Sequence, residues 1–113
     1  MAAARAGASV VVVGAGSHVG GMLTGGLSRT DVERQEALIG GLAAEVFERI
    51  GASYGQQRAW RFEPHVAEAA LRELLGAAAV DVVAGHPLRA ATVSGRRIQA
   101  IASEDGVDRK SVV

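Results

Sequence analysis

The sequence predicts an α/β fold in which a parallel sheet carries helices on its faces and a β-hairpin follows. Two valine-rich runs, Ser9–Val13 and Val80–Ala84, are typical of strands buried on both faces of a parallel sheet. Between these runs the apolar residues recur at helical spacing. Because strands alternate with helices, a parallel sheet is favoured over an antiparallel one.

The remaining elements follow from local signals. Residues 1–7 are predicted to be the last turns of a helix that stops at Gly7, although so short a helix is not stable alone. Gln35–Ile50 is predicted to be an amphipathic helix, and a second helix begins at Pro64, which suits a first turn. Leu88–Val93 and Arg97–Ala102 are expected to pair as a hairpin around a Ser-Gly turn.

Composition excludes several classes of function. The 12 basic and 12 acidic residues balance, and no basic block suggests a nucleic-acid partner. Cysteine is absent, and the three histidines lack the spacing of zinc ligands, so no metal site is expected. The longest strictly apolar run, Val10–Val13, is far too short to span a membrane. We therefore expect a soluble, cytoplasmic protein that contacts neither membrane nor nucleic acid; its oligomeric state stays open.

A glycine-rich loop follows the first strand and is the main candidate for chemistry. Gly14, Gly16 and Gly20 have the spacing G-x-G-x-x-x-G, and backbone at such a turn can approach a phosphate. One interpretation is therefore the first phosphate loop of an NAD(P)-binding protein. However, the Gly-Gly pair at 25–26 would break a helix starting at Gly20. The other interpretations are that Ser9–Val13 is the second strand of a Rossmann unit, or that the chain is a non-catalytic α/β module.

Several segments resemble the FAD-dependent oxidoreductase family, which has a glutathione-reductase-like FAD-binding fold. The resemblance runs from about Ala4 to Gly106, and its most specific pieces are GSHVGGMLTGGL and WRFEPHVAEA. It implies a partial Rossmann-like FAD/NAD(P)-binding domain with FAD as cofactor. It also implies that the complete protein is an oxidoreductase acting on a small-molecule substrate. The catalytic residues and the substrate are not identified by the sequence.

The resemblance also implies cofactor-binding positions. The loop matches the family segment that runs along the flavin and the pyrophosphate, where small side chains and backbone amides are needed. Leu88 matches a position whose backbone commonly meets adenine, and His18 is expected to contact flavin through hydrogen bonds rather than covalently. The full set of expected cofactor-binding residues is Ser17, His18, Gly20, Gly21, Met22, Thr24 and Leu88.

Two departures from the family pattern bear on how much of the site this chain holds. The acidic residue that usually binds the adenosine ribose is replaced by Gly14. The G-x-G-x-x-G loop of the family would lie before Met1. We therefore expect residues 1–107 to be part of an FAD-binding domain truncated at both ends, inactive alone and unable to bind FAD usefully.

The last six residues have a different expected origin. In one codon choice, residues 108–113 spell a common short-read sequencing adapter, and Lys110 is the single lysine beside eleven arginines. We expect this hexapeptide to be translated adapter.

In the polar connection 51–60 and just after it, Arg58, Trp60 and Arg61 could approach a substrate, but a packing role is favoured.

Overall fold

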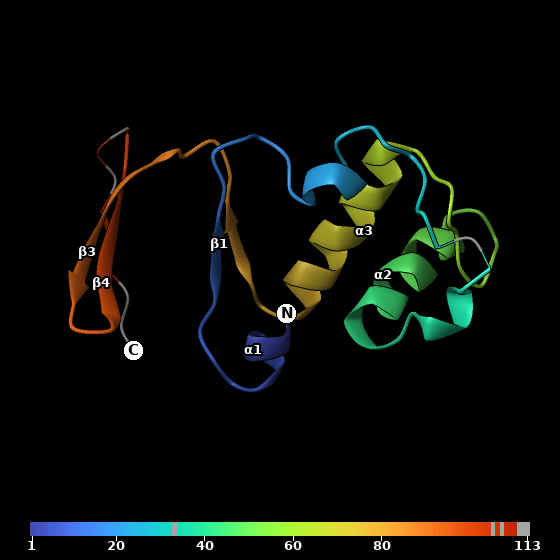
Figure 1. Ribbon diagram of the computed structural model, residues 1–113, viewed down its shortest axis with the longest axis horizontal. Coiled ribbons are helices and arrows are strands. Elements are labelled where there is room, and N and C mark those ends of the chain that lie inside the picture. The colour runs from blue at the N-terminus through green and yellow to red at the C-terminus, as the bar shows by residue number, and fades with distance from the viewer. Residues whose placement is uncertain (33, 105, 107, 111–113) are drawn as a thin grey trace.

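The computed structural model describes residues 1–32, 34–104, 106 and 108–110 of the chain. These form a mixed α/β arrangement with two separate sheets (Figure 1). The elements in chain order are α1 (Ala2–Arg5), β1 (Val11–Val13), the 3₁₀ turns η1 (Gly21–Leu23) and η2 (Glu36–Leu38), α2 (Gly41–Ala52), α3 (Pro64–Ala77), β2 (Asp81–Val83), β3 (Leu88–Ser94), β4 (Arg97–Ser103) and β5 (Asp108–Lys110).

The two valine-rich runs pair in parallel, as predicted. Val12 of β1 lies opposite Val82 of β2, and α3 precedes β2 and contacts it. The observed strands are shorter than predicted, and the expectation of burial on both faces is wrong for β1, because Val11 is 45% exposed. The reason is that, within the residues described, β1 is hydrogen-bonded to β2 alone, which leaves its other edge uncovered.

The predicted amphipathic helix, Gln35–Ile50, is in fact two elements. The short turn η2 ends at Leu38, and α2 begins only at Gly41, which has a φ of +57°. The break falls at the Gly40–Gly41 pair, because Gly40 is extended and Gly41 is left-handed. At its other end α2 continues through Gly51, where a Cβ would lie 2.7 Å from the Cα of Arg58.

The hydrophobic core lies between α2, α3 and the connection that joins them. Ile50 is completely buried, and the Phe47 ring lies 4.7 Å from that of Trp60 and 6.3 Å from that of Phe62, measured between centroids. The predicted start of α3 is confirmed, with Pro64 in the first turn and Glu63 as N-cap. The buried members of the core cluster are Val46, Phe47, Ile50, Ala59, Phe62, Ala67, Ala70 and Leu74.

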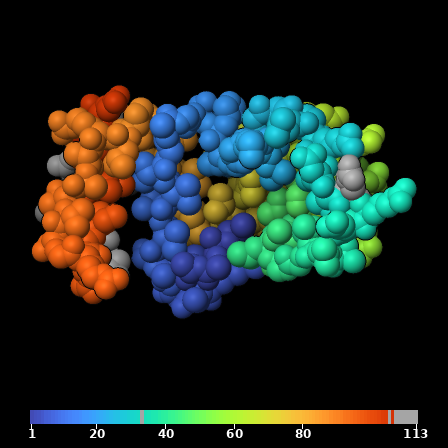
Figure 2. All heavy atoms as spheres, viewed as in Figure 1, coloured from blue at the N-terminus to red at the C-terminus, as the bar shows by residue number. Residues whose placement is uncertain are grey.

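The predicted hairpin is confirmed, and it stands apart from the helices. Every residue of β3 is exposed, and β4 pairs on its other side with β5. Figure 2 shows this sheet as a separate lobe beside β1. The radius of gyration is 16.3 Å, against about 13 Å for a compact domain of this length. The adapter hypothesis concerns β5 and three further residues, 111–113, that lie outside the described part.

The N-terminal helix is also confirmed. It spans Ala2–Arg5, and Gly7 follows with a left-handed φ of +92°. Both guanidinium nitrogens Nη1 and Nη2 of Arg5 donate to Glu45, at 2.8 and 2.7 Å. This ion pair ties the N-terminal segment to α2, and it lowers the pKa of Glu45 while raising that of Arg5.

Candidate functional site

The glycine-rich loop leaves the carboxyl end of β1 and lies beside the segment that leaves β2. The N–H of Gly14 donates to the carbonyl of Val83 at 2.9 Å, and that of Gly85 donates to Gly16 at 2.8 Å. The N–H of His86 donates to the carbonyl of Gly14 at 3.0 Å. These bonds extend the parallel pairing beyond both strands. The segments that leave β1 and β2 therefore lie side by side at the carboxyl edge of the sheet. Ligands of α/β sheets bind at this kind of edge.

The middle of the loop is attached to α3 through one carboxylate. Glu68 Oε2 is hydrogen-bonded to His18 Nδ1 at 2.7 Å, and its Oε1 accepts from Arg72 Nη2 at 2.7 Å and from the N–H of Val19 at 3.4 Å. Arg72 also donates to the carbonyl of Ser17 at 3.2 Å. The hydrogen bonds from His18 and then from Arg72 hold the pKa of Glu68 below its ordinary value, against the opposing effect of burial.

The double glycine forms a tight turn whose two members have different surroundings. Gly20 has a φ of +110°, and a Cβ there would meet the Thr24 side chain and would lie 2.7 Å from Leu71 Cδ1. Gly21 has a φ of +56°, but a Cβ there would meet no atom within 4 Å. Gly20 is therefore required for packing against α3, whereas Gly21 faces open space.

The expected cofactor-binding residues divide by the direction of their side chains. Ser17, His18 and Met22 are exposed, Met22 by 77% of its surface. Thr24 is buried, and its hydroxyl donates to the carbonyl of Val19 at 2.6 Å. Thr24 thus stabilises the turn from inside.

Leu88 is the one expected residue outside the loop. It is the first residue of β3 and is 58% exposed. It follows directly on the segment 85–87, whose backbone is hydrogen-bonded to Gly14 and Gly16. The structure thus brings the loop and the approach to Leu88 to the same edge, although no hydrogen bond joins Leu88 itself to the loop among the described contacts.

Sequence reasoning missed the residues on α3 that support the loop. Glu68 and Arg72 are spaced i, i+4, which signals an ion pair on one helix face. That spacing says nothing about what the face contacts, since pairs of this kind usually face solvent. Leu71 is apolar, but its contact with Gly20 depends on tertiary packing and has no signal in the sequence.

The packing role favoured for the connection is confirmed for Trp60. Trp60 packs against Phe47, and Arg58 Nη2 forms an ion pair with Glu48 at 2.7 Å. Arg61 is exposed.

The glycine-rich segment Gly14–Gly20 is followed by the 3₁₀ turn η1 rather than an α-helix. This disfavours the segment as the first phosphate loop of an NAD(P)-binding protein.

In the part of the chain that the structure describes, no helix has the length and apolar character needed to cross a bilayer, and no group of three or more His, Asp or Glu side chains is placed to hold a metal ion.

The sequence matches the family described as FAD dependent oxidoreductase over residues 1–112. Neither the curated proteins nor the solved structures gave a significant match.

Proposed function

Because the chain belongs to the FAD-dependent oxidoreductase family, we propose that it supplies part of the FAD-binding site of a larger enzyme. The observation that carries this proposal is the edge formed by the carboxyl ends of β1 and β2, with the glycine-rich loop held over it by Glu68. The enzyme would act on a small molecule in the cytoplasm, and its fold would be of the glutathione-reductase-like type.

The residues of the loop fit a bound dinucleotide in one respect. A Cβ at Gly16 or Gly21 would meet no atom within 4 Å, so at both positions the backbone faces open space that a ligand could approach. Gly21 would lie along the pyrophosphate, with Ser17, His18 and Met22 toward the flavin. Leu88 would present its backbone to adenine. When bound, FAD supplies the hydride- and electron-accepting chemistry.

The ribose end fits less well. At the end of β1 stands Gly14, whose N–H and C=O both belong to the backbone pairing with the exit of β2. A carboxylate is therefore missing where the family usually binds the ribose. The open edge of β1, with Val11 45% exposed, is where a further parallel strand would pair. We propose that this strand and its phosphate loop come from sequence preceding residue 1, and that residues 1–107 are one part of the domain.

Flavin content tests this proposal directly. The complete protein should carry flavin absorbance, whereas titration of the 113-residue chain with FAD should give no saturable one-to-one complex at micromolar affinity. A saturable complex with the short chain would show that it is a self-sufficient binding domain. A complete protein that takes up no flavin would overturn the assignment of the cofactor site.

A matched pair of variants locates the cofactor within the complete protein. Gly21→Asp places a carboxylate where the pyrophosphate is expected, and should lower flavin affinity at least about tenfold through charge repulsion. Gly55→Asp is the control, because Gly55 has a similar φ of +65° and equally open surroundings but lies in the turn after α2. Equal flavin content in both variants would remove Gly21 from the site.

A further inference from the structure

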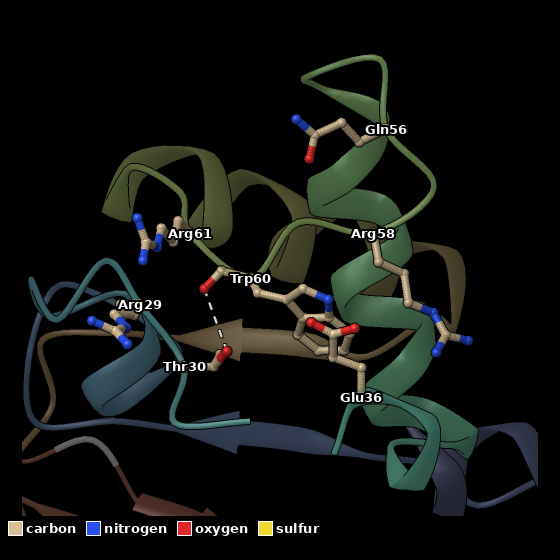
Figure 3. A pocket seen from close by; sticks show the side chains of 7 residues that line it. All are labelled: Arg29, Thr30, Glu36, Gln56, Arg58, Trp60 and Arg61. Atoms are coloured by element: carbon tan, nitrogen blue, oxygen red, sulfur yellow. Dashed lines mark hydrogen bonds between the residues drawn. The ribbon is translucent and has the colours of Figure 1, made fainter. Parts of the chain in front are cut away.

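A pocket of about 410 Å³ lies away from the glycine-rich loop, between the connections on either side of α2 (Figure 3). Arg29 and Arg61 lie on one side of it and Arg58 on the other, with Trp60 between them. Its lining consists of Arg29, Thr30, Glu36, Gln56, Arg58, Trp60 and Arg61. Three of these seven side chains are guanidinium groups, and one is a carboxylate.

Arg29 and Arg61 are placed directly opposite each other by the backbone. The N–H of Thr30 donates to the carbonyl of Trp60 at 3.0 Å, and that of Phe62 donates to Ser28 at 3.1 Å. These bonds flank an antiparallel bridge between Arg29 and Arg61. The two arginines therefore form a non-hydrogen-bonded pair, the arrangement in which opposite side chains come closest on one face.

This pairing concentrates positive charge on one side of the pocket. Like charges directly opposite each other in an antiparallel pair are destabilising. Arg58 is already engaged, because Glu48 accepts from its Nε and Nη2 at 3.1 and 2.7 Å. Within the described part of the chain, neither Arg29 nor Arg61 has a carboxylate partner.

From these contacts we infer that the pocket binds the oxyanion of a small molecule, a carboxylate or a phosphate, between Arg29 and Arg61. Two guanidinium groups can hold such a group through charge-assisted hydrogen bonds, and the bound anion removes the repulsion between them. Trp60 offers an indole surface for the apolar part of the ligand. Glu36, the carboxylate of the lining, opposes an anion and so limits its affinity.

Trp60 is the only tryptophan of the chain and lines this pocket, so its fluorescence can report on a ligand bound there. The 113-residue chain is titrated with benzoate, with inorganic phosphate, and with neutral benzamide as control. Saturation by benzoate assigns the site to an organic carboxylate, and saturation by phosphate alone assigns it to a phosphate-bearing ligand. No saturation below about 10 mM by either anion, or equal binding of benzamide, overturns the inference.

Variants assign any binding to the arginine pair. Arg29→Gln and Arg61→Gln should each weaken the anion about tenfold, and Glu36→Gln should strengthen it. Arg96→Gln, in the distant hairpin turn, should leave it unchanged. Because each arginine variant removes a like-charge contact, its thermal midpoint should stay level or rise. Unchanged affinity in both arginine variants would contradict the site. The readout involves no flavin, so it stands or falls separately from the proposed cofactor site.

Discussion

The helical half and the sheet half of this chain are stabilised in different ways. Among the residues that the structure describes, the eleven buried hydrophobic ones all lie between Ala44 and Val80, in α2, α3 and the segments that adjoin them. The strands β1, β3 and β4 instead expose Val11, Leu88, Val93 and Ile98, each by 45% or more. Apolar burial thus supports the helical half, while the sheet half depends mainly on its backbone hydrogen bonds.

This difference bears on which contacts fix the conformation of the glycine-rich loop. The glycine-rich loop leaves β1, in the sheet half, and its first residues pair with the exit of β2, but its middle, at residues 17–19, is held by Glu68 and Arg72 of α3. The loop therefore depends on the helical core for its shape. The exposed strands contribute a surface, and a surface of this kind is suited to being covered by further protein or ligand.

Truncating one apolar side chain in each half tests this difference in stabilisation most directly. Ile50→Ala removes a side chain with no exposed surface and should cost about 2–5 kcal/mol of unfolding free energy. Ile98→Ala removes the same atoms from a residue that is 53% exposed, and should cost under about 1 kcal/mol. Urea denaturation followed by helical circular dichroism measures both. Similar losses in the two variants would mean that the hairpin sheet carries a core of its own.

The double glycine offers a comparison within the loop. Gly20→Ala should destabilise the chain by about 3 kcal/mol, because a positive φ and a collision with the buried Thr24 side chain, as well as with Leu71, are combined there. Gly21→Ala meets only the left-handed strain and should cost about 1 kcal/mol. The same denaturation experiment applies. If Gly21→Ala proved the more damaging of the two, the loop would not pack on α3 as described.

The smallest expected effect is on acid stability. The pKa of Glu68 is lowered in the folded chain, so the stabilisation from its ionised form is present above the unfolded pKa of about 4.3 and is lost as pH falls through the folded value. Glu68→Gln should therefore lose less stability than the parent between about pH 6 and pH 3. Arg72→Gln removes a partner of the carboxylate, so the acid unfolding of this variant should occur at a higher pH than that of the parent. Parallel acid profiles for all three chains would show that Glu68 does not hold the loop.

The elements predictable from sequence were those with local signals. Pro64 predicted a helix start, the two valine runs predicted a pair of parallel strands, and the glycine of the Ser-Gly pair predicted the hairpin, although Ser94 belongs to β3 and the turn is Gly95–Arg96. The break at Gly40–Gly41 was missed because apolar spacing continues across it, and periodicity does not register a left-handed glycine. The exposure of Val11 was missed because composition predicts what a strand prefers, while burial depends on its neighbours.

For the candidate site, sequence identified the loop but not its support. Ser17, His18 and the double glycine came from a resemblance to a family, and their role in cofactor binding stays a prediction. Glu68 and the facing of Arg29 and Arg61 arise from contacts between segments far apart in the chain. No local pattern encodes such contacts, since they depend on how α3 and the connections pack.

The parallel register of Val12 with Val82 has a consequence for the order of folding. The strands are separated in sequence by both long helices, so their pairing requires a long loop to close before any of its bonds form. The helices, whose contacts are more local, should form first and bring the strand ends together. Residues 14–16 and 85–86 would then become ordered last, and their amide hydrogens should exchange with solvent sooner than those of α2 and α3.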